Sequence, residues 1–304
     1  MKAAVLHEVG SPLSLEDVPE PDVSEGQSLV HVRAAGVNFA DVLIRNGRYP
    51  QPPPLPVILG NEVAGDIDGR RVVAFVRASA GGYAERVAVD DEWIFDLPSS
   101  ASYAEGAAFL TTYLTAWIPL TRQVRLHAGT RVLVTAAAGG VGTAAIQVAT
   151  FAGARVTAAC GSAEKFELCR QLGAERTIAY EEIEGLDDID VAFDPVGGHV
   201  FSACLQSLRP LGVAIAIGFA GGAWEPVDPA RLVGRNIGSQ GFYLGRLMGF
   251  EPALVRREVE ELLVLWRRGA IRPVVGAELP LGQADEAHEL MASRRSTGKV
   301  VLVP

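Results

Sequence analysis

The chain has 304 residues, which is enough for two domains, and its 49% hydrophobic and 21% charged residues are typical of a folded globular protein rather than a disordered one. Its net charge of −9 argues against nucleic-acid binding, because phosphate backbones attract clustered lysines and arginines. Three cysteines without a CxxC pair, and a start that lacks an apolar signal core, predict a reduced, cytoplasmic protein.

The first hundred residues predict a β-rich, barrel-like module. Short apolar runs punctuated by proline and glycine predict strands at residues 2–7, 28–35, 57–59, 71–76 and 83–89. A helix is expected from about Tyr103 to Leu120, because a serine-rich segment opens it and Glu105 lies in its first turn.

From Arg131 the pattern changes to alternating strands and helices. Strands are predicted to begin near Val132, Val156, Thr177, Val191, Val213 and Asn236, with helices at 142–152, 163–172 and 198–208. Such alternation is typical of parallel strands joined by crossovers, that is, a doubly wound sheet. An amphipathic helix at 251–268 follows, and strands at 271–275 and 298–304 are expected to return to the first module.

The segment 131–149 carries the most informative motif, a strand, a glycine-rich turn and a helix. Ala136, Gly139 and Gly142 have A-x-x-G-x-x-G spacing, a variant of the dinucleotide fingerprint. Gly139 is predicted to permit the turn, Gly140 to let a pyrophosphate approach, and Gly142 to let the helix pack closely, while the helix N-terminus offers N–H groups. A turn without a ligand is the alternative. The surrounding charge-free run is long enough to span a bilayer, but this pattern argues against a membrane span.

The end of the next strand indicates which nucleotide is bound. An NAD-binding protein usually has an Asp or Glu there, which accepts hydrogen bonds from the ribose 2′-OH, whereas this chain has Cys160 and Gly161. Gly161 leaves room, Ser162 can donate a hydrogen bond, and Lys165 supplies a positive charge for a 2′-phosphate. The sequence therefore favours NADPH over NADH. Glu164 is interpreted as a first-turn acid favoured by the helix dipole, the alternative being a ribose acceptor.

The whole chain resembles the medium-chain dehydrogenase/reductase superfamily, and within it the quinone oxidoreductase (zeta-crystallin-like) branch. The resemblance covers nearly the full length and rests on the segments AGVNFAD (35–41), RNGRYP (45–50), LGNE (59–62), GGYAE (81–85), AAAGGVG (136–142) and LGA (172–174). It implies an α/β fold, in which a Rossmann doubly wound parallel sheet is inserted into a β-rich GroES-like catalytic domain. The implied domains are residues 1–118 with 266–304 for the catalytic part and 119–265 for the NADP-binding part.

The zinc-dependent alcohol dehydrogenases of the same superfamily provide a contrast. Their catalytic zinc has three protein ligands and one open position. By the family pattern, these ligands would fall at Asn38, Asn61 and Thr111, which are poor zinc ligands, and the cysteine-rich structural zinc lobe is absent. The resemblance therefore implies an enzyme without catalytic zinc.

Without a Lewis acid, the substrate must be easy to reduce, as quinones and conjugated carbonyls are. The resemblance implies that Asn38 and Tyr49 are the catalytic residues, donating an amide and a hydroxyl hydrogen bond to a substrate oxygen. The alternatives are a turn residue at Asn38 and a half-buried aromatic at Tyr49. Leu43 stands where the family often has a second tyrosine, which leaves the identity of the substrate open.

Further cofactor contacts are implied by the resemblance. Thr115 is expected to reach the nicotinamide amide and Tyr180 to border the adenosine. Lys299 is expected to reach the cofactor phosphates, with an edge-strand lysine as the alternative. The segment 194–198, which closes the fourth strand, is interpreted as a simple turn. The full predicted cofactor-binding set is Thr115, Ala138, Gly139, Gly140, Val141, Gly142, Gly161, Ser162, Lys165, Tyr180, Gly218, Phe219, Phe242, Tyr243, Leu244 and Lys299.

Together these features predict a zinc-free NADPH:quinone oxidoreductase. The alternatives are an enone or enoyl reductase of the same superfamily, and a non-catalytic, crystallin-like protein that binds NADPH. The sixth strand, residues 236–244, would be the outer edge of the sheet without Lys, Pro or inward charge to protect it, so a homodimer through this edge is expected. The alternative is that residues 249–268 cover the edge and leave a monomer.

Overall fold

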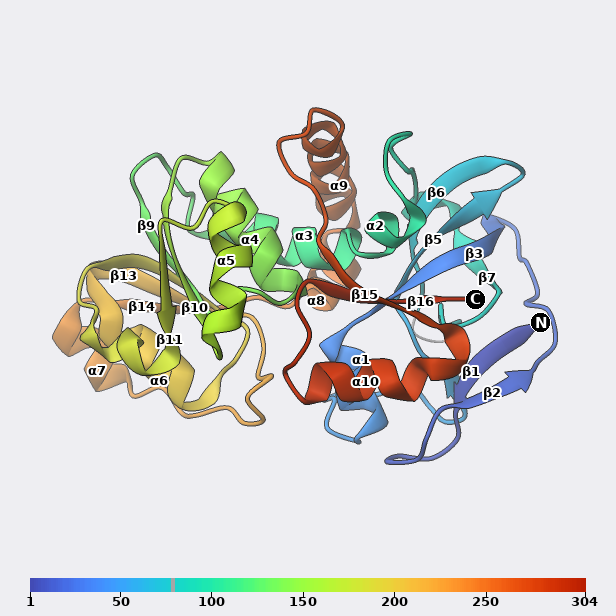
Figure 1. The fold of residues 1–304 in the computed structure, drawn as a ribbon, viewed down its shortest axis with the longest axis horizontal. Coiled ribbons are helices and arrows are strands. Elements are labelled where there is room, and N and C mark those ends of the chain that lie inside the picture. The colour runs from blue at the N-terminus through green and yellow to red at the C-terminus, as the bar shows by residue number, and fades with distance from the viewer. Residues whose placement is uncertain (78–79) are drawn as a thin grey trace. The chain divides into compact units, whose positions relative to one another are not determined.

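The chain folds into two compact units. A computed structural model describes residues 1–77 and 80–304. One unit consists of Met1–Leu110 with Arg272–Pro304, and the other of Thr111–Ile271 (Figure 1). The α/β fold class predicted from the sequence is confirmed, with a parallel sheet in the inserted unit and mainly antiparallel sheets in the unit that it splits.

The inserted unit is longer than the predicted range 119–265 at both ends. Helix α3 (Leu110–Ile118) lies almost entirely within it. The helix predicted over 103–120 is instead a short α2 (Tyr103–Ala107), a break and then α3, which continues into a π-helical turn at Pro119–Gln123. The segment predicted as one helix becomes two helices because the chain passes from the first unit to the second near this break.

The first unit contains a three-stranded sheet of order β2-β1-β4 and a seven-stranded sheet of order β15-β16-β3-β5-β6-β8, in which β7 pairs with β3. All neighbours are antiparallel except β15 and β16. The strands are β1 (Lys2–Leu6), β2 (Ser14–Asp17), β3 (Gln27–Val37), β4 (Val57–Ile58), β5 (Glu62–Ile67), β6 (Arg70–Phe75), β7 (Arg86–Asp90), β8 (Ile94–Asp96), β15 (Val275–Pro280) and β16 (Lys299–Val303).

Short helices complete this unit: α1 (Phe39–Arg45), α2, α10 (Ala284–Ala292) and the 3-10 turns Asp91–Trp93 and Leu281–Gln283. Helices α1 and α10 lie side by side (Figure 1). Apolar side chains from both sheets and from α10 form the main core, with Val30, Val63, Val72, Tyr83 and Leu302 among its fully buried members. This core fixes the strand ends on which the polar residues described below are placed.

Strand β5 was not predicted from the sequence, although its turn carries a clear signal. Strands β5 and β6 pair up to Ile67 and Arg70, so only Asp68 and Gly69 connect them. Both connecting residues have positive φ, 47° and 84°, as a two-residue hairpin loop of the Asp-Gly kind requires.

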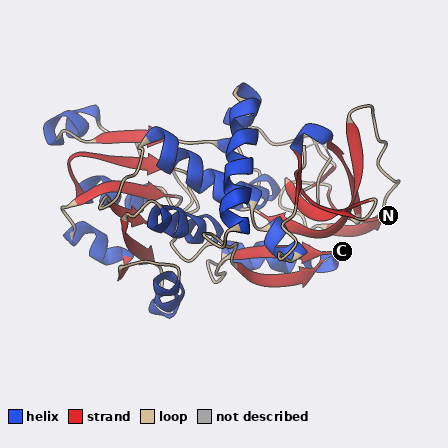
Figure 2. Cartoon of the chain, turned by 90° about the horizontal axis from the view of Figure 1, so that it is seen from above, coloured by secondary structure: helices blue, strands red, loops and turns tan. Residues whose placement is uncertain are grey.

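The second unit is a six-stranded parallel sheet of order β11-β10-β9-β12-β13-β14, with helices on both sides of it (Figure 2). The strands are β9 (Arg131–Val134), β10 (Arg155–Cys160), β11 (Arg176–Ala179), β12 (Ile189–Asp194), β13 (Leu208–Ala216) and β14 (Gly238–Gly241). The order reverses between β9 and β12, which is the switch point where such sheets bind ligands at the carboxyl ends of their strands.

The helices of this unit are α3, α4 (Gly140–Phe151), α5 (Phe166–Gln171), α6 (Gly198–Ser207), α7 (Pro229–Arg235), α8 (Leu244–Phe250) and α9 (Pro252–Arg267), with 3-10 turns at Ala163–Lys165 and Tyr180–Gly185. In the described part of the chain, every helix is too short or too polar to cross a bilayer.

Two predicted strands have different bounds in the structure. The strand expected at 271–275 begins only at Val275, since Pro273 has no N–H group to donate to a neighbour. The sixth strand, expected over 236–244, is confined to Gly238–Gly241. Asn236 ends α7 in the left-handed conformation (φ 53°), and Leu244 already begins α8.

Candidate functional site

The glycine-rich turn lies at the switch point of the parallel sheet and is tied to the strands on both sides of it. The Thr135 N–H donates to the Phe193 carbonyl of β12 (3.1 Å), and the Ala137 N–H donates to the Ala159 carbonyl of β10 (3.2 Å). The N-terminus of α4 follows directly at Gly140. Its first N–H groups have no partner within the helix, so this end suits a phosphate.

Two glycines of the turn can be compared with their predicted roles: Gly142 allows the close packing that was expected, whereas Gly139 is not the residue that turns the chain. A Cβ atom on Gly142 would lie 2.2 Å from the Ala136 carbonyl oxygen, so no side chain fits there. Gly139 is extended (φ −80°, ψ 173°) and the left-handed residue is Ala136 (φ 44°), so Gly139 serves the turn only through its missing side chain, since a Cβ atom there would lie 3.2 Å from the Ala136 carbonyl oxygen. Gly139 also acts as the N-cap of α4.

The residues predicted to select the coenzyme gather beside this turn. The Tyr180 hydroxyl accepts a hydrogen bond from the Ala136 N–H (3.2 Å), and a Cβ atom on Gly161 would lie 3.7 Å from the Tyr180 ring. Gly161 and Ser162 are exposed, and Lys165 is half-buried at the end of a 3-10 turn. A small, open surface with one cation therefore follows the end of β10.

Cys160, the last residue of β10, is buried beneath this surface. Its sulfur lies 3.5 Å from that of Cys169 on α5. Hydrogen bonds from Cys169 and from the Ala138 N–H lower the pKa of the Cys160 thiol. The same hydrogen bond with Cys160 raises the pKa of the Cys169 thiol. The strand end thus carries a sulfur in place of the carboxylate that would bind a ribose 2′-OH.

The segment 194–198 is more than the simple turn that was predicted. Asp194 is fully buried, and its carboxylate accepts hydrogen bonds from the Thr135 hydroxyl and from the N–H groups of Val196 (3.2 Å) and Gly197 (2.7 Å). Burial raises the pKa of Asp194 to about 6. This carboxylate joins the end of β12 to the glycine-rich turn.

The loop after β13 packs on the same segment. The Ile217 N–H donates to the Asp194 carbonyl (2.8 Å), the Ala220 N–H donates to the Pro195 carbonyl (3.1 Å), and a Cβ atom on Gly218 would lie 3.2 Å from that same carbonyl oxygen. The Phe219 ring lies 5.0 Å from that of Trp224. Gly218 and Phe219 are therefore placed at the carboxyl ends of β12 and β13, and their contact with a cofactor stays a prediction.

The remaining predicted contacts of the second unit lie on α3 and after β14. Thr115 is buried on α3. The Phe242 N–H donates to the Ala216 carbonyl (3.0 Å), Tyr243 is exposed, and Leu244 begins α8. Their contact with a cofactor stays a prediction.

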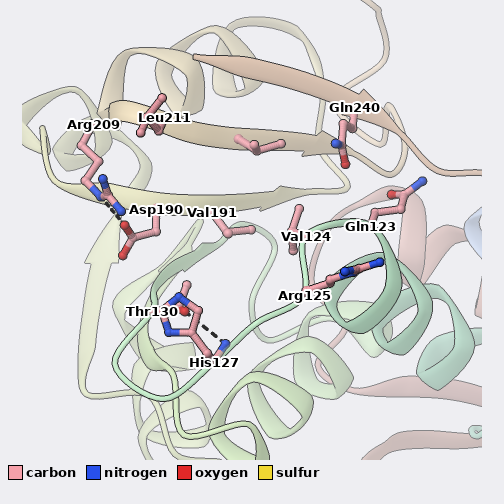
Figure 3. A pocket seen from close by; sticks show the side chains of 11 residues that line it. Gln123, Val124, Arg125, His127, Thr130, Asp190, Val191, Arg209, Leu211 and Gln240 are labelled. Carbon is pink, nitrogen blue, oxygen red and sulfur yellow. Dashed lines mark hydrogen bonds and ion pairs between the residues drawn. The ribbon is translucent and has the colours of Figure 1, made fainter. Parts of the chain in front are cut away.

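A separate pocket of about 260 Å³ lies near the opposite ends of the strands (Figure 3). Thr130 precedes β9, and Asp190, near the start of β12, is paired with Arg209. Because ligands of doubly wound sheets bind at the carboxyl ends of strands, this pocket is not the expected nucleotide site.

In the first unit, a buried ion pair holds the residue predicted to act on the substrate. Lys299 begins β16 and is 3% exposed. Its ammonium donates to Asn38 Oδ1 (2.5 Å) and to Glu62 Oε1 (2.6 Å). The prediction that Lys299 contacts cofactor phosphates is therefore wrong: the ammonium is buried and already bound, and β16 is an interior strand rather than an edge.

Asn38 is also fully engaged. Its Nδ2 group donates one hydrogen to Asn61 Oδ1 (2.7 Å) and the other to Glu62 Oε1 (2.9 Å). An amide nitrogen has only two hydrogens, so none remains for a substrate. The prediction that Asn38 donates to a substrate oxygen is corrected by this geometry. Its side chain is a buried link between Lys299 and Asn61.

Asp41 holds the backbone on both sides of this link. Its carboxylate accepts hydrogen bonds from the Asn38 N–H (2.8 Å), the Tyr83 hydroxyl (2.9 Å) and the Gly60 N–H. Burial raises the pKa of Asp41 to about 6, although these donors and Lys299 oppose the shift. One carboxylate thereby fixes the segment before α1 and the segment before β5.

His288 of α10 extends the network. Its Nε2 lies 3.4 Å from the Tyr83 hydroxyl, whose own proton goes to Asp41. The neutral imidazole therefore donates from Nε2, and burial lowers the pKa of His288 to about 3. Burial and the Asp41 charge raise the pKa of Tyr83 well above its ordinary value.

Comparisons with known proteins agree with this architecture. Residues 24–99 match the family described as alcohol dehydrogenase GroES-like domain, and residues 140–263 match zinc-binding dehydrogenase. The chain is 34% identical to the quinone oxidoreductase-like protein 2 of Mus musculus, over 99% of this chain and 91% of the mouse protein. The chain belongs to the quinone oxidoreductase branch of the medium-chain dehydrogenase/reductase superfamily.

Solved structures of this superfamily have the same fold. The quinone oxidoreductase of Thermus thermophilus, also solved in complex with NADPH, matches with a TM-score of 0.92 and 40% identity over the full length of both chains. A mycobacterial protein complexed with NADPH matches with a TM-score of 0.92 and 32% identity, again over both full chains.

Two of the positions that the family pattern assigns to zinc ligands carry amides in this chain. Asn38 and Asn61, the places of two ligands by the family pattern, are bonded to each other, and the Lys299 ammonium lies against Asn38. Such a set of amides and a buried cation does not suit Zn²⁺. Within residues 1–77 and 80–304, no cluster of three or more His, Cys, Asp and Glu side chains could hold a metal ion.

Several residues of this network were missed by sequence reasoning. Asp41, Glu62, Tyr83 and His288 received no role, and Asn61 was considered only as a lost zinc ligand. The first three stand in AGVNFAD, LGNE and GGYAE, segments that carried the family resemblance. Polar residues inside otherwise apolar segments were the available signal. Tyr49 lies half-buried in the loop after α1, and its catalytic role stays a prediction.

Proposed function

We propose that this protein is an NADPH-dependent reductase of quinones and similar conjugated carbonyls that works without zinc. The observation that carries the proposal is the Lys299–Asn38–Asn61 chain, in which the two residues that the family pattern aligns with zinc ligands are amides bonded to each other, with an ammonium against Asn38. Two relatives solved with NADPH, one of them a quinone oxidoreductase, support the same activity.

The nucleotide-binding residues support NADPH as the reductant. The glycine-rich turn and the first N–H groups of α4 are available for the pyrophosphate. Gly161 and Ser162 leave an open surface for a 2′-phosphate, with Lys165 as its cation, and no carboxylate stands at the end of β10. NADPH, when bound, supplies the hydride of the reaction.

The polar residues of the first unit suit an acceptor whose carbonyl is already activated by conjugation. Hydride addition to a quinone or an enone leaves a delocalised anion, whose oxygen can be stabilised by neutral hydrogen-bond donors. The Tyr49 hydroxyl is proposed as one such donor. A simple ketone would require a stronger electrophile to polarise its carbonyl, and this network offers none.

A steady-state assay with NADPH against a panel of quinones, enones and simple ketones tests the function. We expect oxidation of NADPH with quinones. Activity should be retained after chelator treatment, and elemental analysis should find sub-stoichiometric zinc. Turnover confined to enones would identify an enone reductase instead. Tight NADPH binding without turnover of any acceptor would identify a non-catalytic binding protein.

A further inference from the structure

We propose that Asn61 is the amide that donates a hydrogen bond to the carbonyl oxygen of the acceptor, and that Lys299 and Asn38 set the orientation of that amide. The proposal rests on the reductase function proposed above and names the donor for its product anion. It replaces Asn38, whose hydrogens are both engaged.

The orientation follows from the donors and acceptors alone. An ammonium can only donate, so the group of Asn38 that faces Lys299 must be its oxygen. The Asn38 nitrogen then faces Glu62, which can only accept, and Asn61. Asn61 must therefore present its own oxygen to Asn38.

The two hydrogens of Asn61 consequently point away from the buried network. Among the described residues, no protein atom accepts a hydrogen bond from Asn61 Nδ2, and this side chain is partly exposed. Glu62 and Lys299, by contrast, are almost completely buried. Asn61 is thus the member of this group that a small molecule can reach.

The backbone of Asn61 is held on both sides. Its carbonyl accepts a hydrogen bond from the Val76 N–H (2.9 Å). The preceding Gly60 is left-handed (φ 92°), donates to Asp41, and lies so close to Tyr83 that a Cβ atom would be 2.5 Å from the ring. A donor fixed in this way needs no reorganisation when charge develops on the acceptor, which is what makes such donors effective in catalysis.

The chemistry balances with the proposed reductant. Hydride addition to the quinone forms a C–H or O–H bond and moves an electron pair onto a carbonyl oxygen, where the Asn61 N–H group donates to the anion. After O–H formation, a proton from solvent on the anionic oxygen completes the hydroquinone; after C–H formation, the protonated product is a keto tautomer, which reaches the hydroquinone by losing that C–H proton to solvent as its remaining carbonyl is protonated. The amide keeps both of its protons, and the Lys299 charge, transmitted through Asn38, strengthens the donor by polarising the chain of hydrogen bonds.

The test compares Asn61→Ala with Asn46→Ala, a control at an exposed asparagine that ends α1. We expect Asn61→Ala to lower kcat by about 100-fold, as loss of one preorganised donor does, with NADPH affinity unchanged. The loss should grow across a series of substituted quinones as the acceptor becomes harder to reduce, because a less stable anion depends more on its donor. The control should match wild type.

The outcomes separate this proposal from the function on which it rests. If wild type reduces none of the acceptors, the proposed function fails. If wild type reduces quinones and Asn61→Ala keeps its kcat, or loses the same factor with every quinone, Asn61 is not the donor and the reductase function stands. The double change Lys299→Met/Glu62→Gln removes both buried charges together. We expect it to lower activity less in the Asn61→Ala background than in the wild-type background, because the network then has no donor left to orient.

Discussion

Lys165 is the residue that decides coenzyme preference in our proposal. It ends the 3-10 turn after β10, next to the exposed Gly161 and Ser162. Lys165→Ala should weaken NADPH binding by about 1–3 kcal/mol more than NADH binding, because only NADPH loses a charge-assisted contact. Titration calorimetry with both coenzymes measures the difference. Arg170→Ala, which removes an exposed cation on α5, should leave the preference unchanged. Equal weakening of both coenzymes by Lys165→Ala would show that Lys165 does not touch the 2′-phosphate.

Asp41 should make stability depend on pH in a direction opposite to that of most carboxylates. Its pKa is about 6 in the folded chain against an ordinary 3.8, so the folded state holds the proton more tightly. The stabilisation is complete below pH 3.8 and is lost as pH rises to about 6. A shift of this size corresponds to about 3 kcal/mol.

Asp41→Asn cannot titrate, so the free energy of unfolding of wild type, relative to this variant, should fall by about this amount between pH 4 and pH 7. Denaturant unfolding at each pH gives the curve, and the constant offset from the altered hydrogen bonds does not affect its slope. Asp68→Asn, in the exposed β5–β6 turn, is the control. A flat difference between wild type and Asp41→Asn would contradict the raised pKa.

For single residues, the sequence predicted the location of the polar site better than it predicted which side-chain atom would act on the substrate. Asn38 was identified, but its partner Lys299 is 261 residues away, and nothing in the local sequence shows that an ammonium takes its oxygen. Once that contact is known, the orientations of Asn38 and Asn61 follow. Long-range pairing of donors and acceptors is a property of the folded chain.

At the level of elements, the glycine-rich turn is the part most completely specified by local sequence. A Cβ atom at Gly142 would lie 2.2 Å from the Ala136 carbonyl oxygen and 2.7 Å from Ala137 Cα, both backbone atoms that cannot move alone. Gly142→Ala should therefore cost about 1–3 kcal/mol of stability and also weaken NADPH binding, since the turn must shift. Gly234→Ala, in the last turn of α7 with open space around it, should be neutral or stabilising. Thermal unfolding with and without NADPH tests both variants.

If Gly142→Ala behaved like Gly234→Ala, the close approach of α4 to the turn would not be required. The contrast between the two glycines matters because a position within a helix does not by itself distinguish them, although the A-x-x-G-x-x-G spacing marks Gly142. Both stand in helices, and the neighbouring backbone separates a required glycine from a replaceable one.

The strands of the parallel sheet were easier to predict than the rest for a physical reason. The central strands β9, β10 and β12 are largely buried, so each appears as a mainly apolar run, whereas the edge strand β14 (Gly-Ser-Gln-Gly) does not. The elements that were missed, such as α1, β5 and α10, are short or half-buried, and tertiary contacts fix them. Helix α10 brings His288 to Tyr83, and β5 begins at Glu62, so the missed elements carry much of the candidate site.

For the whole molecule, the alternation of strands and helices was sufficient to predict that one unit is inserted into the other. Its boundaries were harder, because α3 is an apolar helix whose sequence suits either unit. Assembly is a further property of the whole molecule that the local pattern alone does not determine.

A homodimer through β14 is our proposal for this assembly. Strand β14 is the last in the order of its sheet, and its sequence, Gly-Ser-Gln-Gly, has no charge or proline to prevent pairing. Leu211, whose N–H donates to Asn236 just before β14, is 80% exposed, and Val233 of α7 is 77% exposed. The buried carboxylate of Glu258 in α9 accepts hydrogen bonds from Trp117 of α3 and from Arg122 of the π-helical turn after α3. These contacts anchor α9 to α3 and to that turn.

Light scattering at micromolar concentration should give about twice the chain mass of 32.2 kDa. The double variant Leu211→Lys/Val233→Lys should shift the protein toward the monomer, because two cations per chain would be brought together at a twofold axis. Val23→Lys, at an exposed apolar position of the first unit, should remain dimeric. A wild-type mass near 32.2 kDa would refute the dimer. A dimer that withstands the double variant would place the interface elsewhere on the molecule.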